Sequence, residues 1–149
     1  MSPLVIAACL AAHYGCVLVD PAAMTFAAYR DGRVVRTGKA VSGRLRCLED
    51  RGESCKTPVG LHTVSQVYGY SKRSMIYPLT CSDHRRCGAR MYYYMRFGPK
   101  GEGLHGSDEI GATANVSHGC VRIHKEDARW LSQNLVRRGT RVLVLPYRR

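Results

Sequence analysis

Apolar positions in the first third of the chain fall in short runs that stop at turn residues. Residues 16–19 are apolar and β-branched, and the run ends at Asp20-Pro21, which predicts a buried strand. Residues 24–29 and 34–41 are two more strand candidates, with Asp31-Gly32 between them. An Asp-Gly pair between apolar segments favours a tight turn, because both central residues must adopt a positive φ. We therefore predict a β-hairpin at this point.

The middle of the chain alternates loops with strands. Residues 42–56 are polar and contain glycine, which is typical of a loop, and a Thr57-Pro58-Val59-Gly60 turn follows. Residues 68–90 mix serine, arginine, proline and cysteine and predict a long excursion. Loops of this length in compact domains are usually functional or tied down. Apolar or aromatic runs predict further strands at residues 61–67, 91–97 and 141–145.

One segment, residues 125–138, has the periodicity of a helix. Ala128, Leu131 and Leu135 recur at the spacing of one helical face. Acidic residues lie in the first turn and arginines in the last, as the helix dipole favours, and Gly139 supplies a stop. The chain thus combines many strands with one helix, without βαβ alternation and without a glycine-rich phosphate motif. This pattern predicts a mainly β domain and disfavours Rossmann and P-loop folds.

The start of the chain is open to two interpretations. Residues 4–12 form a short apolar stretch that lacks the basic segment and the small-residue cleavage site of a secretory signal. No apolar run of the chain reaches the length of a transmembrane helix. We expect residues 1–15 to be an N-terminal strand or the remnant of a leader. Residues 16–149 are then one domain, which is what a chain of 149 residues allows.

The net charge of the chain indicates the kind of partner it could attract. The chain has 23 Lys and Arg against 11 Asp and Glu, a net charge of +12 with His neutral. Such an excess attracts polyanions, among them nucleic acid, an anionic envelope polymer and a membrane surface. The basic residues are scattered from Arg30 to Arg149 without a long single-sign block. Charge alone therefore leaves these partners open, together with a basic surface that only keeps the protein in solution.

Seven cysteines are many for a chain of this length, and the odd number indicates pairs plus one free thiol. Four lie in the middle of the chain and are the candidate disulfide cysteines: Cys47, Cys55, Cys81 and Cys87. Three connectivities are open for them, and any of these implies an oxidising compartment. The spacing of Cys81, His84 and Cys87 also resembles a set of zinc ligands, which is the rival interpretation. Cys120 lies alone in a polar loop.

Candidate chemistry concentrates in one later segment. A Leu104-His105-Gly106-Ser107 run is followed, after nine residues, by Ser117-His118-Gly119-Cys120-Val121-Arg122. A thiolate is the nucleophile of cysteine enzymes, and a nearby imidazole can take the thiol proton. Glycine before the cysteine lets backbone approach a substrate closely and leaves N–H groups to face an oxyanion. A metal held by the same residues lacks an obvious fourth ligand.

The H-G-S and S-H-G-C-V-R elements together resemble the signature of the L,D-transpeptidase catalytic domain (YkuD-like) family. The similarity extends beyond the motif and covers residues 16–146. Its further elements, in the order of the family, are residues 17–20, the Asp31-Gly32 hairpin, residues 56–60, residues 91–97 and Asp127-Ala128. The resemblance implies an L,D-transpeptidase-like β-sandwich of mixed sheets with one C-terminal helix.

The resemblance also implies a role for each motif residue. Cys120 matches the nucleophile that forms a thioester with a peptidoglycan stem peptide, and His105 matches the base. Ser107 matches the residue whose backbone or hydroxyl orients that imidazole. The N–H groups of Gly119 and Cys120 match an oxyanion hole, and a guanidinium at Arg122 suits a stem-peptide carboxylate. The remaining motif residues that line the implied site are Gly106, Ser117 and His118.

A function follows from the resemblance in the same way. Family members act in the bacterial periplasm or envelope, need no metal or other cofactor, make 3-3 cross-links or attach proteins to the wall, and are acylated by carbapenems. The four central cysteines depart from the family pattern and fall where the cleft is usually covered, which leaves the acyl acceptor open. With water as acceptor, the same thioester makes an L,D-carboxypeptidase or an endopeptidase. A non-catalytic basic module for an anionic envelope polymer is the other alternative, and nucleic acid is not an expected partner.

Overall fold

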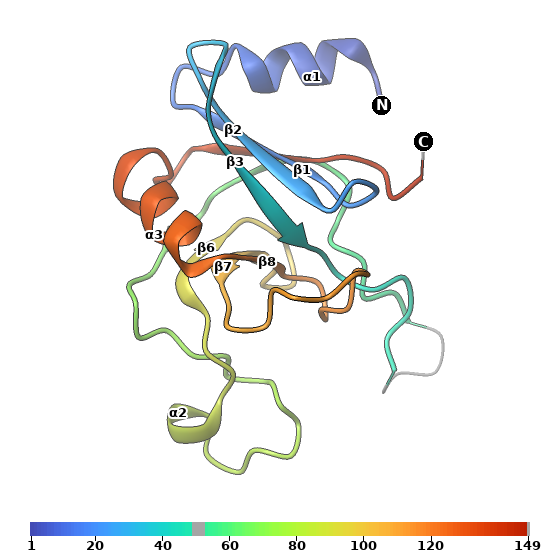
Figure 1. The fold of residues 1–149 in the computed structure, drawn as a ribbon, viewed down its shortest axis with the longest axis vertical. Helices are drawn as coiled ribbons and strands as arrows, with labels where there is room; N and C mark the ends of the chain where they lie inside the picture. The colour runs from blue at the N-terminus through green and yellow to red at the C-terminus, as the bar shows by residue number, and fades with distance from the viewer. Residues whose placement is uncertain (49–52, 149) are drawn as a thin grey trace.

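A curled mixed sheet organises the molecule (Figure 1). The computed structural model describes residues 1–48 and 53–148, so residues 49–52 of the expected loop over 42–56 lie outside the described residues. The strands described are β1 Cys16–Asp20, β2 Thr25–Arg30, β3 Arg33–Val41, β4 Gly60–Thr63, β5 Gln66–Val67, β6 Tyr92–Arg96, β7 Gly103–Gly106, β8 Val121–Ile123 and β9 Arg141–Val144. The helices are α1 Pro3–Leu10, α2 His84–Cys87 and α3 Lys125–Asn134.

The strand order shows how far the sheet curls. In the described residues the order is β4-β9-β1-β2-β3-β8-β7-β6-β5. The two edge strands, β4 and β5, are separated in the chain only by Val64 and Ser65. The sheet therefore curls until the chain passes from one edge to the other at buried Val64, whose N–H donates a hydrogen bond to the Thr140 carbonyl. A strand expected over residues 61–67 is thus two strands, because burying Val64 turns the chain from one edge to the other.

Strand β3 joins the two halves of the sheet. Its first part pairs antiparallel with β2, and its last residues, Ala40 and Val41, pair with β8. The pairs β1/β9 and β7/β8 are parallel, so the sheet is mixed. The predicted hairpin is confirmed, with Asp31 at φ 50° and Gly32 at φ 75°. The mainly β class with a C-terminal helix is confirmed as well.

The core lies inside the curl and is closed on one side by α3 (Figure 1). Ala128 and Leu131 of this helix are fully buried and belong to one core cluster with side chains from both halves of the sheet. The helix ends at Asn134 rather than at Arg138. Leu135 and Val136 also belong to the core, and the Val136 N–H reaches back to the Leu131 carbonyl. Burying these two side chains takes the chain off the helical path before Gly139, which has a positive φ.

The N-terminal segment is a helix, so the strand expected there is wrong. The Ser2 hydroxyl accepts a hydrogen bond from the Leu4 N–H, and Pro3 occupies the first helical position, two features that favour a helix start. A disulfide joins Cys9 of α1 to Cys16 of β1 and fastens the helix to the sheet. None of the described helices is long and apolar enough to cross a membrane.

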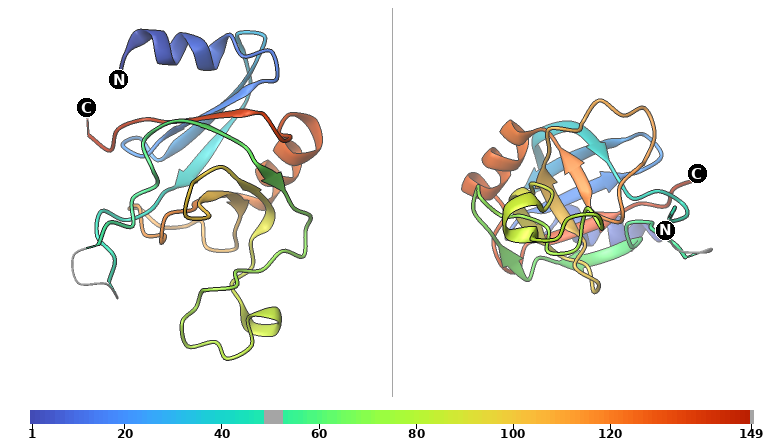
Figure 2. Two further views of the ribbon diagram at one scale, coloured as in Figure 1. Left: turned by 180° about the vertical axis from the view of Figure 1, so that it is seen from behind. Right: turned by 90° about the horizontal axis from the view of Figure 1, so that it is seen from below.

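Residues 68–90, here called the excursion, project from the opposite end of the molecule to α1 (Figures 1 and 2). The excursion carries the short helix α2 and the Cys81–Cys87 disulfide. The other central pair is Cys47–Cys55, so each cysteine bonds the next along the chain. The zinc interpretation is wrong, since Cys81 and Cys87 bind each other and His84 Nε2 faces the Ile76 carbonyl.

Candidate active site

Parallel pairing of β7 with β8 brings Cys120 and His105, the expected nucleophile and base, to one face of the sheet. The register pairs Leu104 with Val121 and sets His105 opposite Arg122. Leu104 and Val121 are fully buried in the core. Because successive side chains of a strand alternate between faces, His105 and Arg122 lie on the other face, and so does Cys120, which directly precedes β8. The Arg122 charge acts on both, since it lowers the pKa of His105 and of Cys120.

His105 is held as a neutral imidazole. Its side chain is almost completely buried, and Nδ1 lies 2.9 Å from the carbonyl oxygen of Gly106. A proton on Nδ1 makes this hydrogen bond and leaves Nε2 as the acceptor. Burial lowers the pKa of His105 to about 4, with a smaller contribution from the Arg122 charge. The imidazole is therefore uncharged near pH 7 and ready to accept a proton.

Cys120 carries the free thiol among the described cysteines and is half-buried. Its Sγ lies 3.9 Å from the Gly101 carbonyl oxygen, in the turn between β6 and β7. Burial raises the pKa of the thiol to about 11, and the Glu102 carboxylate adds to this, while a hydrogen bond from the Gly103 backbone opposes it. The thiol therefore keeps its proton in the resting site. Attack on a carbonyl then requires a base that removes the proton during the reaction.

The turn before Cys120 is fixed by Ser117, which is buried. Its hydroxyl donates to the Cys120 carbonyl and accepts a hydrogen bond from the Gly119 N–H at 3.2 Å. Gly119 has φ 131°, a backbone conformation that side chains other than that of glycine rarely adopt. Of the two N–H groups expected at an oxyanion hole, that of Gly119 thus has an internal partner in Ser117.

Two further motif residues have clear partners. The Ser107 hydroxyl accepts from the Glu109 N–H at 3.0 Å, so the group that orients the imidazole is the Gly106 carbonyl and not the Ser107 hydroxyl. Arg122 Nη1 lies 3.2 Å from a carboxylate oxygen of Glu109, whose side chain is 80% exposed. Arg122 therefore already holds a carboxylate, one that belongs to an open loop.

Comparison with known proteins decides the family. The family model described as the L,D-transpeptidase catalytic domain (YkuD) matches residues 15–144, which is most of the chain. This chain belongs to that family. No curated protein matches it.

Solved structures of L,D-transpeptidases share the fold. One from Xylanimonas cellulosilytica is 30% identical with a TM-score of 0.70, and the match covers 87% of this chain and 59% of that one. One from Mycobacterium smegmatis is 23% identical with a TM-score of 0.69, covering 89% and 59%. L,D-transpeptidase 3 from Mycobacterium tuberculosis, in complex with a faropenem-derived adduct, is 24% identical with a TM-score of 0.70, covering 89% and 60%. The chain thus spans less than two thirds of the length of each of these proteins.

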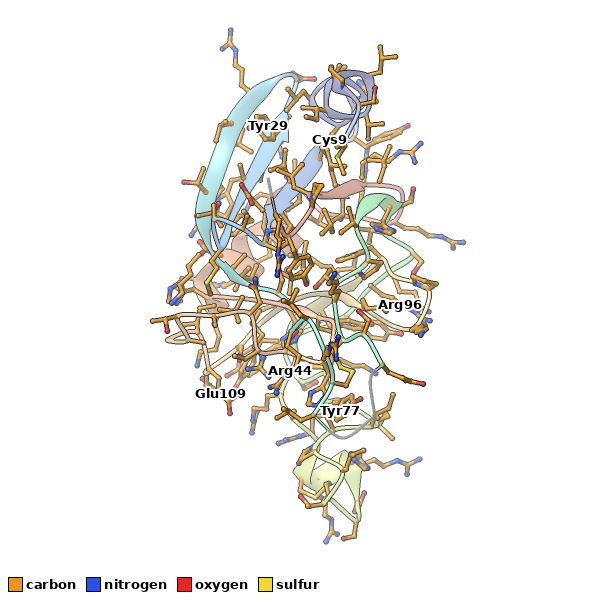
Figure 3. The ribbon with its side chains drawn as sticks, turned by 90° about the vertical axis from the view of Figure 1, so that its right-hand side faces the viewer. Cys9, Tyr29, Arg44, Tyr77, Arg96 and Glu109 are labelled. Carbon is orange, nitrogen blue, oxygen red and sulfur yellow. A yellow bond between two sulfur atoms is a disulfide. The ribbon has the colours of Figure 1, made fainter. Side chains whose placement is uncertain are left out.

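Beside this family site lies a residue that the sequence did not indicate. The ring of Tyr77, in the excursion, stacks on the ring of His118 with centroids 4.0 Å apart and planes 18° apart. Figure 3 shows Tyr77 between the α2 end of the molecule and the sheet. The excursion therefore reaches the residue two positions before Cys120. No local sequence pattern predicts this contact, because it joins segments about forty residues apart.

Proposed function

We propose that this chain is an L,D-transpeptidase domain that forms a thioester between Cys120 and a peptidoglycan stem peptide. One observation carries the proposal: the β7/β8 register sets a free thiol and a buried neutral imidazole on the same face of the sheet. The family match and the fold support the same chemistry. Three disulfides among the described cysteines favour an oxidising compartment, so we place the domain in the bacterial envelope.

The reaction starts with a neutral pair. His105 Nε2 takes the thiol proton while Sγ bonds to the carbonyl carbon of the stem peptide, and the carbonyl oxygen becomes an oxyanion. When the oxyanion collapses, the C–N bond breaks and the imidazolium gives its proton to the departing amine, which leaves a thioester. An acceptor amine then attacks the thioester and loses a proton to His105, and the displaced Cys120 sulfur takes that proton from the imidazolium, which restores the neutral pair. A 3-3 cross-link is the product when the acceptor amine belongs to a second stem.

Arg122 is the residue of choice for a carboxylate of the donor stem. A guanidinium binds a carboxylate through paired, charge-assisted hydrogen bonds, and this one is only 22% exposed beside the nucleophile. Glu109 pairs with Arg122 from an exposed loop position, so a substrate carboxylate exchanges with that side chain at small cost. The arrangement favours a stem whose carboxylate near the reacting carbonyl is free rather than amidated.

Acylation by a carbapenem tests the function directly. Intact-mass spectrometry of the folded protein with imipenem is expected to show one adduct on the wild type and none on Cys120→Ala. Cys120→Ser is the matched control, since it keeps a small polar side chain in place of the thiol. Labelling of wild type and Cys120→Ala to the same extent, or of neither with both folded, would contradict the proposal.

The acceptor is settled by products rather than by acylation. Incubation with defined tetrapeptide muropeptides is expected to give dimers linked between third residues. Trimmed tripeptides without dimers would instead identify a carboxypeptidase acting through the same thioester, and cleaved dimers an endopeptidase. Each outcome retains Cys120 as the nucleophile and changes only what attacks the thioester.

A further inference from the structure

We propose that Thr57 is a positioning residue for the oxyanion donor of this site. Its hydroxyl holds the peptide between Gly119 and Cys120 so that the N–H of Cys120 faces the reacting carbonyl. The inference rests on the proposed function, because it concerns an oxyanion that forms only when Cys120 attacks a carbonyl. Thr57 lies outside the His105–Cys120 motif, more than sixty residues from Cys120 in the chain.

Thr57 is fully buried and its hydroxyl makes two hydrogen bonds. The hydroxyl donates to the Gly119 carbonyl at 2.7 Å and accepts from the Gly43 N–H at 3.0 Å. A hydroxyl has a single proton to donate. Because the Thr57 oxygen accepts from Gly43, that proton is left for the Gly119 carbonyl. The direction of the Gly119 carbonyl is therefore set by a side chain that is itself held on the other side.

The geometry of the peptide bond converts this contact into an effect on the N–H of Cys120. A trans peptide is planar, and its C=O and N–H point in opposite directions. With the Gly119 carbonyl turned to Thr57, the N–H of Cys120 is turned away from Thr57. Since Ser117 holds the N–H of Gly119, the N–H of Cys120 is the donor in this turn that is left to meet an oxyanion.

A second hydroxyl holds Thr57 in place. The Tyr147 hydroxyl donates to the Gly43 carbonyl at 2.7 Å and accepts from the Thr57 N–H at 2.9 Å. A Cβ added at Gly43 would lie 2.9 Å from the Gly119 Cα, so glycine is what allows these segments to approach. Gly43 also forms a bridge with Ser117. The segments that carry Gly43, Thr57 and Tyr147 are thus joined to one another beside the turn that precedes Cys120.

Two reagents separate positioning of the oxyanion donor from general damage. Imipenem acylates the thiol through a carbonyl and an oxyanion, whereas iodoacetamide alkylates it by displacing iodide, without an oxyanion. Thr57→Val keeps the shape of the side chain and removes the hydroxyl. We expect this variant to lower the second-order acylation rate roughly 10- to 100-fold, because removal of a whole oxyanion donor costs about 100- to 1,000-fold. Its alkylation rate should stay within about twofold of wild type.

Matched variants complete the experiment. Thr57→Ser keeps the hydroxyl and should restore most of the acylation rate, and Thr37→Val makes the same change at an exposed site of β3 and should leave both rates unchanged. Tyr147→Phe keeps Thr57 itself and provides a milder variant if Thr57→Val does not fold. It should lower acylation with no change in alkylation.

Either of two results would overturn the inference: acylation by Thr57→Val at the wild-type rate, or acylation and alkylation reduced by the same factor. If Tyr147→Phe is used because Thr57→Val does not fold, the same two results in Tyr147→Phe would overturn the inference. A wild type that alkylates but is never acylated would overturn the proposed function instead, so the two failures are distinguishable.

Discussion

The two sides of the site are built differently. The strand that carries His105 and the strand that follows Cys120 pair inside the sheet, and their core-facing side chains are fully buried. The excursion that brings Tyr77 to His118 exposes much of its apolar surface, with Met75 and Ile76 each 57% exposed. His105 thus lies on a paired strand, while Tyr77 comes from a loop held by a disulfide. This contrast predicts that sheet changes affect the chemical step and excursion changes affect binding.

The largest effect is expected on the sheet side. His105→Gln leaves no group that takes the thiol proton, so the rate of Cys120 acylation should fall roughly 100- to 10,000-fold. The measurement is the second-order rate with imipenem by intact mass. His124→Gln, at the exposed start of α3, is the matched control and should react like the wild type. Unchanged acylation in His105→Gln would remove the imidazole from the mechanism.

Acid is expected to destabilise the same sheet side. Burial lowers the pKa of His105 to about 4 from 6.5, so the unfolded chain binds this proton first as the pH falls. Above pH 6.5 both states leave His105 neutral, so its titration does not lower the free energy of unfolding. As the pH falls from 6.5 to about 4, the free energy of unfolding decreases by about 3 kcal/mol. Denaturant unfolding at pH 7 and pH 4.5 measures the loss. His105→Gln should lose correspondingly less, and an equal loss in both proteins would contradict the burial account.

Arg122 lies on the sheet but faces the substrate, so its effect should depend on the substrate. Arg122→Gln should lower kcat/KM roughly 10- to 100-fold for a stem with a free carboxylate near the reacting carbonyl. An amidated stem should lose far less. Arg129→Gln, an exposed arginine of α3, controls for the loss of one positive charge. An equal fall in kcat/KM for both stems would show that Arg122 does not bind the carboxylate.

The smallest effect is expected from the excursion. Tyr77→Ala removes the ring that stacks on His118 and should raise KM for the donor about two- to tenfold, in the range of one aromatic pair. The rate of Cys120 alkylation by iodoacetamide should not change, and Tyr77→Phe, which keeps the ring, should bind as wild type. A change in the alkylation rate would mean that the excursion also sets the reactivity of the thiol.

The strand pattern and the motif could be predicted because they are local. Asp31-Gly32 specifies its own turn, and the residues around His105 and Cys120 carry the family signature in two short segments. The helical face of Ala128 and Leu131 follows from periodicity alone, although its end does not. That end depends on burying Val136, which is a property of the assembled core.

Contacts between distant segments could not be predicted. Stacking of Tyr77 on His118 depends on how the excursion folds back. The central disulfides join cysteines only eight and six residues apart, but the count of four cysteines alone leaves three connectivities open. Thr57 is recognisable in the sequence as part of a family-like segment, but its hydrogen bond to Gly119 forms only when the fold brings the two residues together. The helix at the start of the chain does not follow from the sequence, because an apolar run of that length fits a strand as well.

The most direct test of the account is the intact mass of the protein during turnover of a tetrapeptide stem. The account predicts a thioester on Cys120 whose mass equals the stem minus its terminal residue, together with release of that residue as a free amine. In Cys120→Ala both should disappear. Release of the terminal residue by Cys120→Ala at the wild-type rate, or turnover by the wild type with its nucleophile blocked by iodoacetamide, would contradict it.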